Sequence, residues 1–307
     1  MQTGTSNEQV VIPGLRKITF AFDGSENSLQ ALEAAAIIAK GYGAEVSIAY
    51  ALQPSSIFST MHQREEYYTK LESNASKSIE KAMSFLVTNE VVKARSKILH
   101  SRGSITESLI DYVSEEKSDL VVCGTRGLGG FDRMLLGSIS GQLVSHSPSP
   151  VLVVRKPEAA KKMEIKRILV ATDGSETASR AMGLAISLAK ALGGKLTFVN
   201  VVYLPPISYG VDEGIDFNRL MADLREDGEK ITKEAIFIAQ KMGVEADRKI
   251  IDGLRSPSMA ITELAEKEKY DLIAVGTRGR GEFKRLILGS VANGVVHYAH
   301  CSVLVAR

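Results

Sequence analysis

The chain has 307 residues, of which 44% are hydrophobic and 24% are charged, and its formal net charge is +2. This length suggests two domains of ordinary size, with enough apolar residues for a sizeable core. The balanced charge gives no reason to expect nucleic acid or an anionic membrane as a partner. Two cysteines, Cys123 and Cys301, are too few for a disulfide framework and fit a reducing cytoplasm.

The N-terminal residues lack a basic region followed by an apolar run, so we expect no signal peptide and interpret 1–14 as a flexible tail. The first strand is predicted at Ile18–Phe22, and "DGS" follows it from Asp23. A helical stripe of leucine and alanine comes next, with Ser25 as the predicted N-cap and with Gly41 and Gly43 ending the helix.

Four further apolar runs predict buried strands, at Val46–Ala51, Ser96–Leu99, Leu120–Cys123 and Val151–Val154. Helical patterns separate them, including a long one at 61–90. Such alternation predicts a parallel sheet that is doubly wound, with helices on both faces. Sheets of this kind bind ligands beyond the carboxyl ends of their strands.

A glycine-rich stretch, "GTRGLGGFDRMLLGS", begins at Gly124 between the fourth strand and a helical pattern at Ser138. Glycine lets main-chain N–H groups approach an anion, and a helix N-terminus adds further donors, so the stretch is interpreted as a phosphate-binding loop. It is neither a Walker A loop nor a dinucleotide fingerprint, because no Gly-Lys-Ser/Thr and no Gly-x-Gly-x-x-Gly is present. A plain loop is the alternative.

The whole arrangement recurs in the second half of the chain. "DGS" returns at Asp173, "GTRGRGEFKRLILGS" at Gly276 and the closing strand "VLVAR" at Val303. The recurrence of the glycine spacing weakens the plain-loop alternative. We therefore predict two copies of one domain, at 15–155 and 166–307, which are joined by a linker at 156–165.

The spacing Gly124-x2-Gly127-x9-Gly137-Ser138, repeated from Gly276, resembles the ATP-binding signature of the universal stress protein family. The resemblance covers nearly the whole chain and implies a tandem member. It implies a Rossmann-like five-stranded parallel sheet with strand order 3-2-1-4-5 in each domain. It also implies one adenine nucleotide (ATP, ADP or AMP) per domain as the cofactor, with Mg²⁺ as a further option.

The resemblance assigns Asp23 and Asp173 to ribose or phosphate, through a divalent metal ion in some members. The alternative is that each aspartate only opens a turn with the following glycine. The arginines of the loops either pair with phosphate or are solvated. The other positions implied for the nucleotide are Ala51, Gly124, Arg126, Gly127, Gly137, Ser138 and Ile139 in the first half, and Val201, Gly276, Arg278, Gly279, Gly289, Ser290 and Val291 in the second.

No nucleophile–base pair recurs in both halves, so no catalytic residue is assigned. His297, His300 and Cys301 are interpreted as non-ligands, because a metal site needs three or four convergent ligands and the first half has no counterparts. The predicted function is that of a nucleotide-dependent stress-response or signalling protein. The alternatives are a slow ATPase or autophosphorylating enzyme, with Ser138 or Ser290 as acceptor, and a chaperone-like protein with structural ATP.

The two closing strands, Val151–Arg155 and Val303–Arg307, carry neither proline nor an inward charge that would blunt a sheet edge. We expect them to pair antiparallel within one chain, as an intramolecular pseudo-dimer with the nucleotide pockets outside the interface. The resemblance implies that single-domain members of the family dimerise through this strand. Homodimerisation of whole chains is a further expectation.

Overall fold

The computed structural model describes residues 10–53, 61–101, 103–125, 136–155, 163–204, 216–253, 256–279 and 288–307. The strands of the first half are β1 (Lys17–Phe22), β2 (Glu45–Leu52), β3 (Ala94–His100), β4 (Leu120–Gly124) and β5 (Val151–Val154). Its helices are α1 (Glu26–Tyr42), α2 (Met61–Thr88), α3 (Ile105–Glu116) and α4 (Ser138–His146).

The second half repeats this order. Its strands are β6 (Arg167–Ala171), β7 (Lys195–Tyr203), β8 (Ala246–Gly253), β9 (Leu272–Gly276) and β10 (Ser302–Ala306). Its helices are α5 (Glu176–Leu192), α6 (Phe217–Lys241), α7 (Pro257–Lys267) and α8 (Ser290–Tyr298). Within the part of the chain that the structure describes, no helix has the length and apolar character needed to cross a membrane.

All ten strands form one sheet, in the order β3-β2-β1-β4-β5-β10-β9-β6-β7-β8. Within each half the strands pair in parallel, so both halves have the predicted order 3-2-1-4-5. The predicted fold class, two doubly wound α/β domains in tandem, is therefore confirmed.

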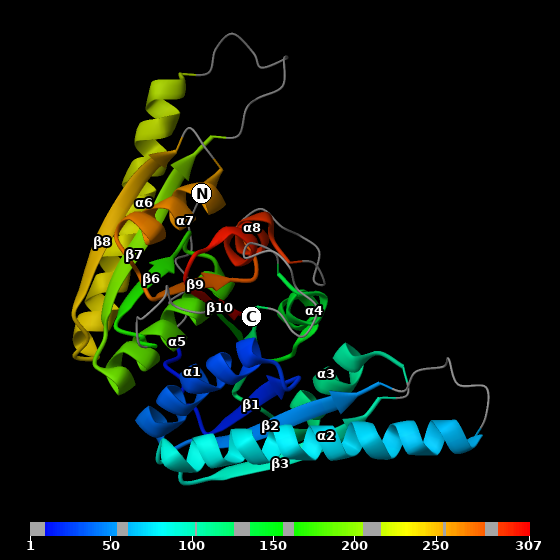
Figure 1. Cartoon of the computed structure of the whole chain (residues 1–307). Helices are drawn as coiled ribbons and strands as arrows, with labels where there is room; N and C mark the ends of the chain where they lie inside the picture. Colours follow the sequence, from blue (N-terminus) through cyan, green and yellow to red (C-terminus); the bar gives the residue numbers. More distant parts are fainter. Residues whose placement is uncertain are drawn as a thin grey trace, which may run out of the picture.

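The two halves meet through β5 and β10, which pair antiparallel in the middle of the sheet. Figure 1 labels β10 between β1 and β2 of the first half and β6 and β7 of the second. Leu304 lies directly opposite Leu152, and both side chains are fully buried. The expected pairing of the two closing strands is thus confirmed. Because each half is internally parallel, this one antiparallel pair makes the carboxyl ends of the first five strands point opposite to those of the second five.

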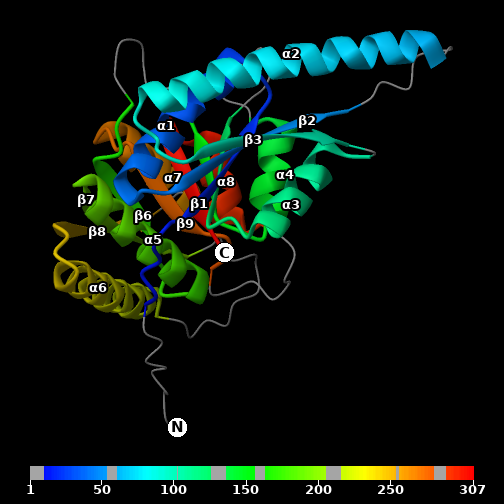
Figure 2. The same ribbon diagram turned by 90° about the horizontal axis from the view of Figure 1, so that it is seen from below.

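The helices cover both faces of the continuous sheet. One buried cluster joins residues of α1, α2, α5 and α6 to one face, and a second joins residues of α3, α4, α7 and α8 to the other. Both clusters contain residues from the two halves, and α2 and α6 flank the outer strands at opposite ends (Figure 2). The central strands β4, β5, β9 and β10 are almost wholly buried, as expected for strands covered on both sides.

Helix α1 begins as the sequence predicts, because the Ser25 hydroxyl accepts the N–H of Ser28 at 3.1 Å. It ends at Gly43, which adopts the left-handed conformation with φ of 64°. The prediction that Gly41 also ends the helix is wrong, since Gly41 lies inside it. A β-carbon there would lie 2.7 Å from Cδ2 of Leu192 in α5, so this glycine allows the two helices to approach across the domain boundary.

Part of the predicted N-terminal tail packs on the second domain. The carbonyl of Pro13 accepts a hydrogen bond from Ser187 in α5, and Ser187 in turn accepts one from the Tyr42 hydroxyl at 2.7 Å. The carbonyl of Val11 passes so close to Gly183 that a β-carbon would lie 2.1 Å from it. Residues 1–9 of the predicted tail and 156–162 of the predicted linker lie outside the described residues.

Replacing both Leu152 and Leu304 by lysine should separate the two domains. Each lysine would place an unpaired charge in a fully buried position, and the two like charges would lie directly opposite each other. We expect a larger radius of gyration in small-angle X-ray scattering and a lower unfolding temperature. The matched control is lysine at Val87 and Val92, which are 69% and 91% exposed. Unchanged scattering and stability in the Leu152/Leu304 variant would contradict the interface.

Candidate functional site

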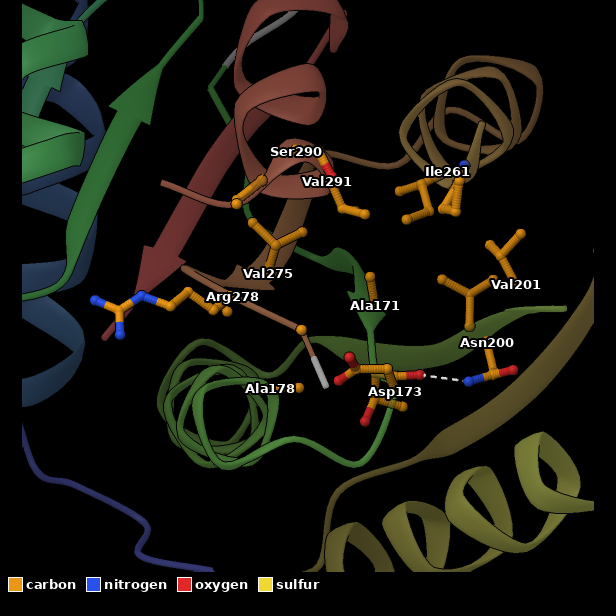
Figure 3. Close-up of a pocket in the computed structure, with 17 residues that line it drawn as sticks. Ala171, Asp173, Ala178, Asn200, Val201, Ile261, Val275, Arg278, Ser290 and Val291 are labelled. Atoms are coloured by element: carbon orange, nitrogen blue, oxygen red, sulfur yellow. Dashed lines mark hydrogen bonds between the residues drawn. The ribbon is translucent and has the colours of Figure 1, made fainter. Parts of the chain in front are cut away.

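A cavity of about 340 Å³ opens at the carboxyl edge of the second domain (Figure 3). It lies beyond the ends of β6, β7 and β9 and is closed by the first turns of α7 and α8. This is the position where doubly wound sheets bind ligands. The structure brings together here all eight residues predicted in the second half: Asp173, Val201, Gly276, Arg278, Gly279, Gly289, Ser290 and Val291.

The cavity has an apolar part and a polar part. Val201 and Ile261 lie at one end of it, near β7 and α7, and Val275 lies beside Val291 on the side of β9 and α8 (Figure 3). Asp173 lies closer to β6 and α5, and Ser290 marks the first turn of α8. A largely apolar lining with a few placed polar groups is typical of a small-molecule site.

Asp173 is held against the start of the glycine loop. Its Oδ1 accepts the N–H of Ser175 at 3.0 Å, and a β-carbon at Gly279 would lie only 2.7 Å from its Oδ2. Only glycine at position 279 therefore leaves the carboxylate where it is. In the first half, Oδ1 of Asp23 accepts from the N–H of Ser25 at 3.0 Å and from its hydroxyl at 2.7 Å. Both aspartates thus open a turn through these hydrogen bonds.

The two glycine loops are tied at their ends in the same way. The N–H of Gly289 donates to the carbonyl of Thr277 at 2.8 Å. The N–H of Gly137 donates to the carbonyl of Thr125 at 2.7 Å. Gly137 and Gly289 are also the N-caps of α4 and α8, and neither helix has a side-chain cap. Ser138 and Ser290 are therefore the first helical residues and do not cap their helices. A helix start without a side-chain cap suits an anion.

Thr177, a residue that the sequence did not single out, fastens the second loop to α5. Its hydroxyl donates to the carbonyl of Arg278 at 2.6 Å and accepts the N–H of Arg278 at 3.2 Å. Ser175 donates to the same carbonyl at 3.2 Å. A β-carbon at Gly276 would lie 2.5 Å from the carbonyl carbon of Thr177, so this glycine permits the contact. The first half has Asn27 in place of Thr177.

The main chain of Arg278 lines the cavity, but its side chain points away from Asp173, toward β10 and the first domain (Figure 3). Burial, and next the charge of Arg278, lower the pKa of Arg307, which follows β10. The guanidinium of Arg278 is thus directed to the domain boundary. Its predicted counterpart Arg126 lies outside the described residues, as does Gly127.

The remaining first-half residues lie at the equivalent edge of their own sheet. Ala51 is near the end of β2 and Gly124 ends β4. Gly137, Ser138 and Ile139 form the start of α4. Residues 126–135, which connect β4 to α4, are not among those described, so the lining of this region is not assigned.

The two halves differ at the end of their second strands. In β7, the Asn200 amide donates to the carbonyl of Thr172 at 2.8 Å and lines the cavity. In β2 the same place holds Tyr50, whose hydroxyl donates to the carbonyl of Asp23 at 3.1 Å. Burial, and next the charge of Asp23, raise the pKa of Tyr50. A polar residue inside the apolar run "TFVNVVY" was the signal that could have identified Asn200.

Among the described residues, no group of three or more histidine, cysteine, aspartate or glutamate side chains could hold a metal ion. Nε2 of His300 lies 3.2 Å from Glu266, and Nδ1 of His297 lies 2.8 Å from the carbonyl of Asn293. Burial raises the pKa of both cysteine thiols to about 12. The cysteines are therefore not thiolates near neutral pH.

Fold and cavity together define a doubly wound α/β protein with a ligand-sized site at the switch point of its sheet. The model of the universal stress protein family matches residues 14–155 and again residues 164–307. The chain therefore belongs to the universal stress protein family, as a member with two tandem domains.

Individual relatives agree with this assignment. The chain is similar to universal stress protein MJ0531 of Methanocaldococcus jannaschii, with 35% identity over 46% of this chain and 82% of that protein. It is 31% identical to universal stress protein Mb2019 of Mycobacterium bovis, over 83% of this chain and 75% of the relative. A universal stress protein crystal structure from Archaeoglobus fulgidus matches with a TM-score of 0.65 and 25% identity, covering 95% of this chain and 98% of that one.

Replacing Thr177 by valine keeps the shape of the side chain but removes both hydrogen bonds to Arg278. We expect the unfolding temperature to fall by about 2–6 °C, since each lost bond costs on the order of 1 kcal/mol. Differential scanning calorimetry checks this. Asn27→Ala, at the exposed equivalent position of the first half, is the matched control. Equal effects of the two substitutions would argue against a fastening role for Thr177.

Proposed function

We propose that this chain is an adenine-nucleotide-binding stress protein, with one nucleotide in each domain. ATP, ADP or AMP would lie at the carboxyl edge of each five-stranded unit. The bound nucleotide would alter the conformation or the partners of the chain, as in a stress-response or signalling protein. Two free cysteines, the buried Cys123 and the partly buried Cys301, suit the reducing cytoplasm as its location.

One observation carries this proposal. Eight residues taken from three separate stretches of sequence, around Asp173, Val201 and Gly276–Val291, line a single cavity in the second domain. The stretches are far apart along the chain, and they come together because β6, β7 and β9 are neighbours in a parallel sheet. Membership of the family supports the same function.

The residues fit a nucleotide in two respects. The apolar end near Val201 and Ile261 suits a flat, weakly polar base. The other end offers the first turn of α8 and the main chain near Gly279, where a β-carbon would collide with Asp173. A phosphate would be held there by main-chain N–H groups and by the positive end of the helix.

Asp173 and Asp23 are the residues that we propose for ribose or for a nucleotide-bound Mg²⁺. Each carboxylate follows the first strand of its domain and is already oriented by the main-chain N–H of the N-cap residue of the next helix. Oxygen ligands from one or two carboxylates, together with phosphate, are the usual environment of Mg²⁺. The ion would therefore be carried by the nucleotide and would not be held by the protein alone.

Isothermal titration calorimetry with ATP should give two sites per chain. Valine at Gly137 or Gly289 should remove one site each, because a branched side chain at the helix start would occupy the space of the phosphate. Neither glycine has a positive φ, so the valine variants are expected to fold. Gly14→Ala is the control, because a β-carbon there would meet no atom within 4 Å and Gly14 has no positive φ.

A single site in the unsubstituted chain, or two sites in the Gly137→Val/Gly289→Val double variant, would contradict the proposal. Phosphate release, measured alongside, separates binding from turnover. Sustained release that the double variant abolishes would favour the alternative of a slow ATPase.

A further inference from the structure

Helices α4 and α8 each connect a predicted phosphate site to the other domain. Helix α8 has nine residues, so its two ends are about 13 Å apart. Its first turn lines the cavity of the second domain. Its last turn faces the first domain, because the antiparallel β5–β10 pair places the carboxyl edge of one sheet beside the amino edge of the other.

Arg155, the residue directly after β5, binds the last turn of α8. Its Nη2 donates to the carbonyl of Val296 at 2.8 Å and to that of His297 at 3.0 Å. The helix supplies no i+4 donor for these two carbonyls, since its last such bond runs from the N–H of Ala299 to Val295. Arg155 is only 9% exposed, so the first domain contributes a buried cation to the end of a helix in the second.

Arg307 makes the reciprocal contact. It follows β10 and donates from Nη2 to the carbonyl of Ser145 in the last turn of α4. The same offset of 152 residues separates Arg155 from Arg307 and Ser145 from His297. The two contacts are therefore related by the internal repeat, and each helix is held by the domain to which it does not belong.

The chemistry of the two helix ends is complementary. The N-terminus of a helix carries a partial positive charge and favours an anion, and the C-terminus carries a partial negative charge and favours a cation. A phosphate at Ser290 and the guanidinium of Arg155 would therefore bind opposite ends of α8. The phosphate and the guanidinium would both stabilise α8 in its folded conformation and in its present position.

We propose that Arg155 and Arg307 are positioning residues for the nucleotide site of the opposite domain, acting through α8 and α4. This rests on the proposed nucleotide binding. Arg155 fixes the helix start at Gly289 in the second domain, and Arg307 fixes the helix start at Gly137 in the first. Each nucleotide site thereby depends on a residue of the opposite domain.

A crossed set of variants tests this. In the full chain, Gly137→Val should remove the first site, so that only the second can bind ATP. Gly289→Val should remove the second site, so that only the first can bind ATP. Arg155→Met should weaken ATP binding by roughly 5- to 30-fold in the Gly137→Val background, and by less than about twofold in the Gly289→Val background. Arg307→Met should show the reverse pattern. Arg155→Lys, which keeps the charge, should restore part of the affinity.

Arg225→Met is the control, because it removes an exposed arginine of α6 that pairs with Asp252. Circular dichroism and gel filtration verify that each variant is folded and that the domains stay joined. Equal weakening of both sites, or no weakening of either, would show that the arginines only join the domains and would overturn the inference alone. Absence of ATP binding by the unsubstituted chain would remove the proposed function, and this inference with it.

Discussion

The arrangement of this protein depends on the antiparallel pairing of β5 with β10. Each domain by itself would leave an apolar, β-branched strand at its edge, and the pairing covers both edges within one chain. It extends the sheet to ten strands and lets two core clusters run across both domains. It also reverses the second sheet relative to the first, which places the two carboxyl edges on opposite sides of the molecule.

This reversal explains the contacts at the boundary. Arg155 follows the carboxyl end of β5 and lies beside the last turn of α8. Arg307 follows β10 and lies beside the last turn of α4. On one face of the sheet, α1 and α5 approach closely because Gly41 has no side chain to meet Leu192. Among the described residues, the domain interface thus includes one strand pair, one helix pair, two arginine contacts related by the repeat, and the contacts of Val11, Pro13 and Tyr42 with α5.

The sequence predicted most of this fold, because its signals are local and occur twice. Apolar runs such as Leu120–Cys123 and the N-cap Ser25 determine elements within a few residues, and the glycine spacing marks the edge where the cavity lies. The roles of Gly41 and Arg155 could not be predicted from such local signals. Their roles come from residues more than 100 positions away, whose proximity follows only from the strand pairing.

The two sites have the same framework but different side chains. Asn200 stands where the first half has Tyr50, Thr177 where it has Asn27, and the buried Ser140, which donates to the carbonyl of Gly124 at 2.6 Å, has Ala292 as its counterpart. The glycines and aspartates that would contact phosphate and ribose are the same in both. Under the proposed function, the two sites would therefore bind the same kind of ligand with different affinities.

Hydrogen–deuterium exchange of the full chain with and without ATP tests the central claim most directly, because it measures the main-chain N–H groups that would hold the phosphate. The account predicts that ATP slows exchange at the start of α8, at 289–291, and at the start of α4, at 137–139. It predicts little change at the amino edge of the outer strands, for example in β3 and β8. Protection that is absent from both helix starts, or that appears only elsewhere, would contradict the account.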